Sequence, residues 1–291
     1  MISKIHKLIL GTVQFGIDYG VNNKNGKPSE SEVENILLRA YQAGIRCLDT
    51  AESYGDAHRI IGDFHRRHTG IRFDIITKVP QNFKGTLSAK IQAYKEELNV
   101  DRLKGILFHS YHTYSDKKNE LVQLGTLKQT GEIENIGVSV YTNLQIEDVI
   151  RDKLVDVVQL PFNLFDNINL RGEVLRKIND EGKTVHARSA FLQGLFFMAS
   201  DSDHKIAKAL GSELDHLRKI LTTYNITIQE LALNYCLQQP MIHNVLFGID
   251  NLSQLNQNLS DASYTLTSNL ISKIEEIRVK NVDMLNPSLW S

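Results

Sequence analysis

The sequence predicts one α/β domain of 291 residues, folded as an eight-stranded (β/α)8 barrel, the TIM barrel. Two observations lead to this fold class. Short apolar runs alternate with longer amphipathic stretches, and parallel strands need helix-length connections of this kind. Eight such units in about 250 residues suit a closed barrel better than an open doubly wound sheet. Because no glycine- or serine-rich linker divides the chain, we expect a single domain over residues 1–291.

Each predicted strand is a short, mainly apolar run. The eight runs are Leu8–Leu10, Arg46–Asp49, Asp74–Lys78, Gly105–His109, Ile133–Val138, Val155–Gln159, Lys183–Ala187 and Asn244–Phe247. A parallel barrel brings the carboxyl ends of all its strands to one rim, where functional groups collect. Residues at or just after these eight ends are therefore the candidates for a functional site.

The segments between the strands have the apolar spacing of helices. In Glu32–Ala43, apolar residues recur at i, i+3 and i+4, and Ser29 and Ser31 precede the segment as expected caps. The other predicted helices are Leu87–Leu98, Leu121–Thr130, Leu144–Arg151, Glu173–Asn179 and Ile228–Gln238. Glycines follow three helix ends, where a positive φ is favoured: Gly44, Gly131 and Gly182.

The composition excludes several classes of protein. Hydrophobic residues make up 42% of the chain, which is enough for a large core. A net charge of −1 gives no electrostatic reason to expect nucleic acid or an anionic membrane as partner. Without a long apolar run or a leader pattern, we expect a cytoplasmic protein that does not enter membranes. We also expect Cys47 and Cys236 to be buried, reduced thiols, and the histidines form no metal-binding motif.

Four polar or ionisable side chains lie at, or just after, the ends of three successive predicted strands. Asp49 ends the second strand, Lys78 the third and His109 the fourth, and Tyr54 lies in the D-T-A-E-S-Y segment after Asp49. An ammonium beside a phenol favours phenolate, so Lys78 is expected to lower the pKa of Tyr54. Asp49 would keep Lys78 charged, and His109 would orient a substrate carbonyl. The pattern predicts a site that delivers a proton to a carbonyl oxygen.

Seven motifs in register make the chain similar to the aldo-keto reductase superfamily, and to its bacterial branch in particular. They are L-G-T-V-Q-F-G (Leu10–Gly16), L-D-T-A-E-S-Y-G (Leu48–Gly55), I-T-K-V (Ile76–Val79), L-F-H (Leu107–His109), I-G-V-S (Ile136–Ser139), V-Q-L-P-F-N (Val158–Asn163) and F-G-I-D-N (Phe247–Asn251). The resemblance implies a nicotinamide-dependent oxidoreductase that reduces an aldehyde or ketone to an alcohol. It also implies a catalytic tetrad of Asp49, Tyr54, Lys78 and His109, with Tyr54 as general acid.

The resemblance further implies a cofactor that lies across the top of the barrel. A Rossmann site is not indicated, because no G-x-G-x-x-G follows an early strand. The residues assigned to the cofactor in this way are Gly11, Thr12, Ser139, Gln159, Arg188, Gln193, Gly194, Gly248, Asp250, Asn251, Gln254, Gln257 and Asn258. Among them, Ser139 and Gln159 match positions that hold the nicotinamide carboxamide.

Two of these positions bear on the choice of cofactor. Arg188 stands where many family members have a tyrosine under the nicotinamide, and an arginine there should favour the neutral reduced ring over the cationic oxidised ring. Contact with a cofactor phosphate is the leading alternative role for Arg188, ahead of a surface salt bridge. Around Asp250 the segment has no lysine or arginine for a 2′-phosphate, so NAD(H) is favoured over NADP(H). Lys205 or Lys208 remains an alternative source of a cation.

The expected substrate is a polar carbonyl compound, such as a sugar or a sugar derivative. Its pocket would be lined by Phe15, Asp18, Tyr19, Tyr54 and Tyr111–Tyr114. Two other functions stay open at this point. Lys78 would be the nucleophile of a Schiff-base enzyme, or the chain would be a nicotinamide-binding subunit without turnover. We expect a monomer or a weak oligomer, because no heptad pattern indicates a coiled coil.

Overall fold

The strands form a closed barrel in which each is parallel to the next and β8 pairs with β1. A computed structural model describes residues 4–23, 26–83, 85–199 and 201–290. The strands are β1 (Leu8–Gly11), β2 (Cys47–Asp49), β3 (Asp74–Val79), β4 (Gly105–Phe108), β5 (Ile136–Ser139), β6 (Val157–Pro161), β7 (Thr184–Arg188) and β8 (Asn244–Phe247). The (β/α)8 prediction is thereby confirmed.

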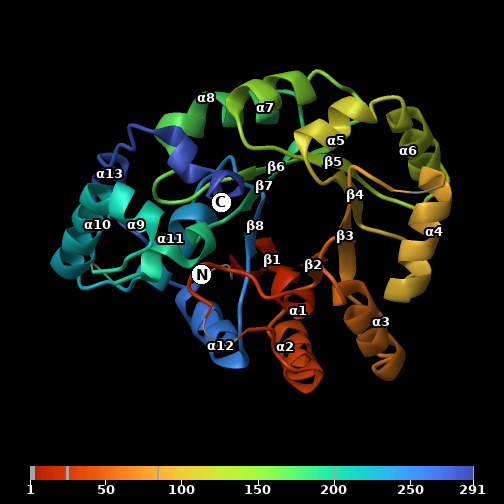
Figure 1. The fold of residues 1–291 in the computed structure, drawn as a ribbon, viewed down its shortest axis with the longest axis horizontal. Coiled ribbons are helices and arrows are strands. Elements are labelled where there is room, and N and C mark those ends of the chain that lie inside the picture. Colours follow the sequence, from red (N-terminus) through yellow and green to blue (C-terminus); the bar gives the residue numbers. More distant parts are fainter. Residues whose placement is uncertain (1–3, 24–25, 84, 200, 291) are drawn as a thin grey trace.

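Helices surround the barrel (Figure 1). They are α1 (Val13–Gly16), α2 (Glu30–Gln42), α3 (Ala57–Arg67), α4 (Leu87–Leu98), α5 (Tyr111–Asp116), α6 (Glu120–Gln129), α7 (Asn143–Val149), α8 (Ile168–Asp180), α9 (Lys205–Ala209), α10 (Gly211–Tyr224), α11 (Ile228–Leu237), α12 (Leu252–Asp261) and α13 (Ser268–Glu275). Short 3-10 turns occupy Lys4–Lys7 (η1), Leu192–Phe197 (η2), Val282–Leu285 (η3) and Pro287–Leu289 (η4).

Four of the five local signals named above act as predicted, whereas Ser31 lies inside α2 and does not cap it. Ser29 caps α2 by accepting a hydrogen bond from the backbone N–H of Glu32. Gly44, Gly131 and Gly182 have φ values of 100°, 81° and 68°. The bounds of α8 were wrong, because the Asn167 side chain caps the helix from Ile168, ahead of its apolar repeat.

Only β8 has the predicted bounds, and the other strands are shifted by one to three residues at one or both ends. The residues before Ile136 were assigned to a strand, but Ile133 forms only an isolated bridge with Leu103. His109 follows β4 instead of ending it, although its backbone N–H still bonds to the carbonyl of Val79 at 3.0 Å. This bond keeps His109 at the carboxyl rim.

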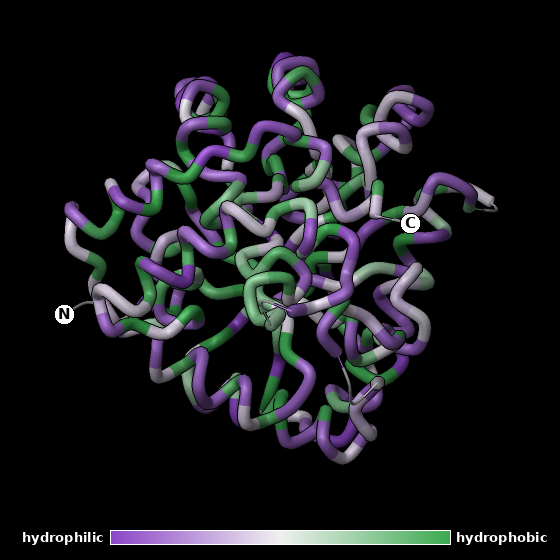
Figure 2. Tube along the Cα trace, turned by 60° about the vertical axis from the view of Figure 1, so that its left-hand side comes forward, coloured by the Kyte–Doolittle hydropathy of each residue, from purple (hydrophilic) through white to green (hydrophobic). Residues whose placement is uncertain are grey.

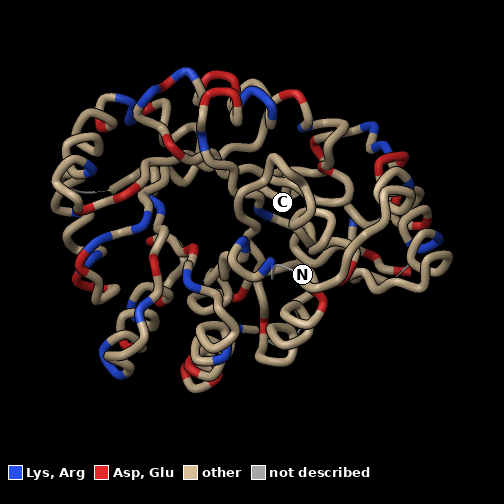
Figure 3. The backbone as a smooth tube through the Cα atoms, turned by 180° about the vertical axis from the view of Figure 1, so that it is seen from behind, with Lys and Arg blue, Asp and Glu red and all other residues tan. Residues whose placement is uncertain are grey.

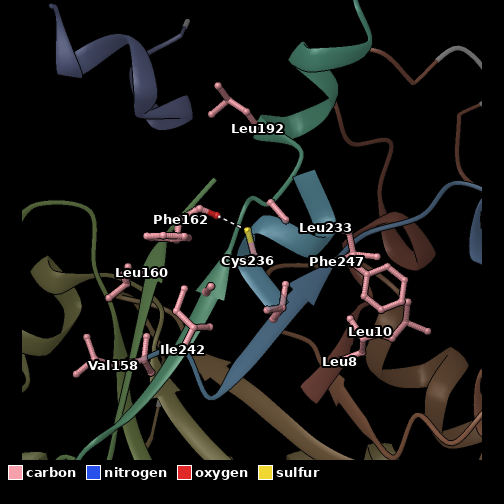
Figure 4. Close-up of a cluster of buried hydrophobic side chains, with 14 of the residues drawn as sticks. Leu8, Leu10, Val158, Leu160, Phe162, Leu192, Leu233, Cys236, Ile242 and Phe247 are labelled. Carbon is pink, nitrogen blue, oxygen red and sulfur yellow. Dashed lines mark hydrogen bonds between the residues drawn. The ribbon is translucent and has the colours of Figure 1, made fainter. Parts of the chain in front are cut away.

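The main hydrophobic core lies between the barrel and its helices, and Figure 2 shows apolar residues concentrated toward the centre of the molecule. Figure 4 shows part of this layer, where Cys236 of α11 donates from Sγ to the carbonyl oxygen of Phe162 at 3.3 Å. The expectation for Cys236 is confirmed, since it is a free and buried thiol. Cys47 is also free but only half-buried, which corrects the expectation of full burial.

A second, smaller apolar cluster fills the inside of the barrel. It consists of Ile9, Ile76, Leu107 and Leu246, with Cys47 packed against it. Because side chains alternate along a strand, the residue two positions after Cys47 or Ile76 faces the interior as well. Those residues are Asp49 and Lys78. The alternation thus places the charged groups directly above an apolar floor.

Charged residues of both signs are distributed along the outer elements (Figure 3). Several connect neighbouring helices, as Arg67 does with Glu34 at 3.0 Å. Within the described ranges, no helix has the length and apolar character needed to cross a membrane.

Candidate active site

Lys78 is at the centre of the predicted tetrad. Its Nζ donates to Oδ1 of Asp49, to the carbonyl oxygen of Thr50 at 3.1 Å and to the hydroxyl of Tyr54 at 3.5 Å. The side chains of Lys78 and Asp49 are only 2% and 4% exposed. A buried ion pair of this kind is held by good geometry and additional hydrogen bonds. The structure therefore brings together three of the four predicted catalytic groups around one ammonium.

The loop that carries Tyr54 is fixed to its surroundings at both ends. The N–H of Thr50 bonds to the carbonyl of Ile76 at 2.8 Å, and the N–H of Ala57 bonds to the carbonyl of Tyr54 at 3.1 Å. Between them, Glu52 accepts hydrogen bonds from Lys90 and Tyr94 of α4. These contacts hold the Tyr54 phenol next to Lys78.

Burial governs the acidity of Tyr54, and this corrects the prediction from the sequence. Burial raises the pKa of the phenol, and the positive charge of Lys78 opposes that rise without cancelling it. For Lys78, burial alone would lower the pKa, but Asp49 and Tyr54 leave the pKa above its ordinary value. At neutral pH the site therefore contains a protonated phenol beside a stable ammonium.

His109 faces Tyr54 across the same space. The two rings meet edge to face, with centroids 5.7 Å apart, and Nδ1 of His109 lies 3.2 Å from the hydroxyl of Ser53. Burial and the charge of Lys78 lower the pKa of His109 to about 4. The imidazole is therefore neutral near pH 7 and suited to hydrogen bonding of an uncharged oxygen.

The tetrad opens into a cavity of about 450 Å³ on the carboxyl rim of the barrel. All four tetrad residues line it. Of the residues assigned to the cofactor, those that line the cavity are Gly11, Thr12, Ser139, Gln159, Arg188, Gln193, Gly194, Gly248, Asp250, Gln254, Gln257 and Asn258. Asn251 does not line the cavity, because its side chain caps α12 by accepting from the N–H of Gln254.

Two polar residues of the cavity also support the tetrad, which the sequence did not predict. The Nε2 of Gln159 donates to Oδ2 of Asp49 at 2.9 Å, so both carboxylate oxygens of Asp49 are bonded. The hydroxyl of Thr12 donates to the backbone carbonyl of Asp49 at 3.1 Å. The orientation of Asp49 is consequently fixed from three sides.

Arg188 reaches from the end of β7 toward the end of β5. Its guanidinium lies over the ring of Tyr141, with Cζ 4.1 Å from the ring centroid, and donates to the carbonyl of Val140 at 3.1 Å. A weaker bond of 3.4 Å goes to the hydroxyl of Ser189. The buried Nε has no hydrogen-bond partner. One face of the guanidinium is thus covered by Tyr141.

The loop after β7 meets the loop after β1 across the cavity. Gln193 donates from Nε2 to the Tyr19 hydroxyl at 2.6 Å, and the N–H of Val21 bonds to the carbonyl of Gln193 at 3.1 Å. Gln193 and Gly194 have φ values of 54° and 91°, a region that glycine adopts easily and other residues rarely. The cavity is therefore bordered by a tight, left-handed turn.

The predicted substrate wall is only partly correct. Tyr19 and Tyr54 line the cavity, whereas the others are engaged elsewhere. Phe15 belongs to the hydrophobic core, and Asp18 accepts a hydrogen bond from Asn23. The segment Tyr111–Tyr114 forms part of α5, in which Tyr111 bonds to Asp148 and Tyr114 is buried.

Other residues that line the cavity were not predicted from the sequence. Gln14 and Tyr141 are the most informative. Gln14 is a buried amide between the apolar residues Val13 and Phe15, and a polar residue between apolar neighbours was the available signal. Tyr141 gave none, because its exposure depends on how the loop after β5 turns.

The cavity suits an extended polar ligand such as a nicotinamide dinucleotide. Two buried polar atoms on its wall, Oε1 of Gln14 and Nε of Arg188, have no hydrogen-bond partner, and such atoms are costly unless a bound molecule meets them. Gly248 lies against the amide of Gln14, since a Cβ there would come 2.8 Å from Nε2 of Gln14. The described residues include no cluster of three or more metal ligands.

A closed barrel with a protonated phenol, an ammonium and a neutral imidazole around one cavity defines the class of barrel enzymes that act on carbonyl groups. Residues 7–279 match the model of the aldo/keto reductase family. The chain therefore belongs to the aldo/keto reductase family. As a member, it is a nicotinamide-dependent oxidoreductase that reduces carbonyl compounds.

Alignments with individual relatives also extend over most of the chain. The NADH-specific methylglyoxal reductase of Escherichia coli is 23% identical, over 86% of this chain and 91% of that protein. The D-threo-aldose 1-dehydrogenase of a Pseudomonas species is 20% identical, over 86% and 89%. The solved holo form of an aldo-keto reductase from Bacillus halodurans has a TM-score of 0.78 at 20% identity, covering 94% of this chain and 93% of that one. At 20% identity, the similarity to this solved structure shows a shared fold.

Proposed function

We propose that the chain reduces a polar aldehyde or ketone with Tyr54 as the general acid. One observation carries the proposal: the Tyr54 hydroxyl lies 3.5 Å from an ammonium that Asp49 holds in place. A general acid has to be protonated at the working pH, and burial raises the pKa of Tyr54 accordingly. A reduced nicotinamide, when bound, supplies the hydride for the carbonyl carbon.

Each of the four tetrad residues has its own role in the reaction. Tyr54 gives its proton to the carbonyl oxygen as negative charge develops there. Lys78 stabilises the phenolate that Tyr54 becomes, and Asp49 keeps Lys78 charged and oriented. His109, neutral at pH 7, donates a hydrogen bond from Nε2 to the same carbonyl oxygen and sets its direction. Its Nδ1 faces the Ser53 hydroxyl at 3.2 Å, which leaves Nε2 for the substrate.

We assign the carboxamide of the cofactor to Ser139 and Gln159, which are adjacent in the register of β5 and β6. Because Nε2 of Gln159 is bonded to Asp49, its Oε1 is the atom that would accept from the carboxamide nitrogen. Ser139 is 5% exposed and supplies a hydroxyl on the same wall. This arrangement would tie the position of the nicotinamide to that of the Asp49–Lys78 pair.

NAD(H) is our proposed cofactor. Asp250 and Gln254 both line the cavity and bond to each other at 3.1 Å, so a 2′-phosphate bound beside them would meet a carboxylate. Neither Lys205 nor Lys208 is among the described residues of that wall, and Lys208 pairs with Asp203 at 2.6 Å. The NADH-specific relative is consistent with this choice.

The proposed substrate is a sugar or a sugar derivative with a free carbonyl group. The reaction end of the cavity presents hydroxyl groups on aromatic rings, from Tyr19 and Tyr54, together with Ser139. Such groups bind hydroxylated compounds, and one relative is named as an aldose dehydrogenase.

We further propose that the chain acts as a single domain, in the cytoplasm and as a monomer or weak oligomer.

The two other functions have less support. A Schiff-base lysine has to lose its proton, whereas Asp49 keeps the pKa of Lys78 above its ordinary value despite burial. A binding subunit without turnover does not require a complete tetrad, yet all four groups line one cavity here.

The decisive experiment compares the wild type with Tyr54→Phe. First, fluorescence titration with NADH and NADPH identifies the tighter cofactor, which we expect to be NADH. A panel of aldoses and short aldehydes is then assayed for turnover. We expect Tyr54→Phe to bind the cofactor as tightly as the wild type and to lose about 10²- to 10⁴-fold in kcat, the usual contribution of a positioned acid. Equal turnover by both proteins would refute the role of Tyr54.

A further inference from the structure

Two cationic side chains line the described part of the cavity, and only one of them has an anionic partner. Lys78 is paired with Asp49. Arg188 makes no ion pair with a described residue, and its hydrogen bonds go to two uncharged oxygens, those of Val140 and Ser189. Each Nη carries two N–H groups and makes only one of these bonds, so the guanidinium retains donors in a planar fork that matches a carboxylate or a phosphate.

None of the described carboxylates at the cavity forms an ion pair with Arg188, and Asp250 bonds to the amide of Gln254. Both oxygens of Asp166 are bonded to Arg171, at 2.6 and 2.7 Å. The Asp49 carboxylate is bonded to Lys78 and Gln159. An unpaired charge next to a low-dielectric wall is costly, so the cavity favours an occupant that carries negative charge near Arg188.

Arg188 faces the reaction end of the cavity. Its guanidinium lies on Tyr141 and bonds to Val140, the residue after Ser139. Burial is the largest influence on the pKa values of Tyr54 and His109, yet the charge of Arg188 also acts on both. The positive charge and the two groups that would meet the carbonyl oxygen therefore share one space.

We propose that Arg188 binds a carboxylate or phosphate of the substrate, so that the preferred substrates are anionic carbonyl compounds such as oxo acids or phosphorylated sugars. The proposal rests on the proposed function, in which Ser139 and Gln159 hold the nicotinamide. In that arrangement Gln193 and Gly194, which also line the cavity, would hold the cofactor phosphates. The anion beside the carbonyl consequently comes from the substrate.

The test uses two substrate pairs that differ only in the anionic group or its replacement. They are D-glyceraldehyde 3-phosphate with D-glyceraldehyde, and 2-oxobutyrate with butanone. For the wild type we expect kcat/KM to be about 10- to 100-fold higher for the anionic member, the usual effect of a hydrogen bond to a charged group. This preference should shrink with added salt. Arg188→Met should bring the ratio close to one, and Arg188→Lys should retain part of it.

A matched control separates a local effect from a change in net charge. Arg176 is exposed on α8, where its Nε bonds to the carbonyl of Gly172 at 3.3 Å. Arg176→Met should leave both the ratio and the turnover unchanged. In parallel, fluorescence titration measures the Kd of NADH for each variant, since binding of the cofactor does not depend on turnover.

If the anionic preference persists unchanged in Arg188→Met, another group binds the anion and the proposal is wrong. A wild-type enzyme that uses both members of each pair equally well overturns the proposal, even if Arg188→Met does not fold. If Arg188→Met weakens NADH binding and lowers kcat/KM equally for both members, the anion is a cofactor phosphate and the proposal is wrong. If no carbonyl compound is turned over with either cofactor, the proposed function itself fails.

Discussion

Gly16, at the end of α1, lies against the backbone of Tyr54. A Cβ built on Gly16 would come 1.6 Å from the carbonyl oxygen of Tyr54 and 2.8 Å from the backbone nitrogen of Ala57. The contact is reciprocal, because a Cβ on Gly55 would come 2.5 Å from the carbonyl oxygen of Gly16. Because Gly16 has no side chain, α1 can pack against the loop that carries Tyr54. The position of the phenol depends on this close approach.

Gly16→Ala should displace Tyr54 and slow the reaction. The new methyl group meets backbone atoms, which cannot move aside without shifting the loop, and overpacking of this kind costs about 1–3 kcal/mol of stability. A shift of the phenol by a fraction of an ångström should lower kcat by about 10- to 100-fold. We expect the Kd of NADH to change little. Steady-state kinetics and fluorescence titration measure these two quantities.

A matched glycine and a double-mutant cycle test whether the effect passes through Tyr54. A Cβ on Gly70 would meet no heavy atom within 4 Å, and the residue has no positive φ, so Gly70→Ala should be neutral. In a Tyr54→Phe background, Gly16→Ala should have no further effect on kcat, because the group that it displaces is already gone. Additive losses in the double variant would show that Gly16 acts by another route.

The pH dependence of carbonyl reduction follows from two shifted pKa values. Tyr54 donates only when protonated, that is, below its pKa, which burial raises above the ordinary value of about 10. His109, with a pKa of about 4, stays neutral throughout the neutral range. We therefore expect kcat for reduction to be level from about pH 6 to about pH 10 and to fall only above that. A break near pH 6.5 that disappears in His109→Gln would contradict the neutral imidazole.

Arg188→Tyr tests the redox preference that the sequence predicts for this position. A fixed cation beside the nicotinamide repels the oxidised, positively charged ring and leaves the neutral reduced ring unaffected. We expect the variant to lower the ratio of the Kd of NAD⁺ to the Kd of NADH by about tenfold. Fluorescence titration for the reduced form and competition for the oxidised form give the ratio. An unchanged ratio means that the guanidinium, held by Tyr141 and Val140, does not act on the ring.

The fold and most of the site were predictable because their signals are local. An apolar run predicts a strand. Asp49 and Lys78 each come two positions after a residue at the barrel interior, so the alternation along the strand directs their side chains to the barrel mouth. The contact between Gln159 and Asp49 was not predictable, since it joins residues 110 positions apart through the closure of the barrel. The direction of the Tyr54 pKa shift was missed for a related reason. Proximity to Lys78 can be expected from strand order, whereas the extent of burial depends on the loops that cover the mouth.

The stability of the folded protein should also depend on pH through a histidine outside the active site. His58 of α3 is 2% exposed, and its Nε2 lies 2.8 Å from the hydroxyl of Thr77 on β3. Burial lowers the pKa of His58 to about 4, below its ordinary value of about 6.5, so the unfolded chain binds a proton more readily than the folded chain. The stabilisation is complete above pH 6.5 and is lost as the pH falls from 6.5 through about 4.

For this one group, we expect a loss of about 2 kcal/mol in the free energy of unfolding between pH 7 and pH 5. Urea denaturation at the two values measures it. His58→Gln should lower stability at pH 7 but remove much of the pH dependence, because an amide can bond to Thr77 without titrating. His112, an exposed residue on α5, provides the control, and His112→Gln should retain the wild-type slope. If His58→Gln keeps that slope as well, the acid sensitivity originates in other buried groups and His58 does not contribute to it.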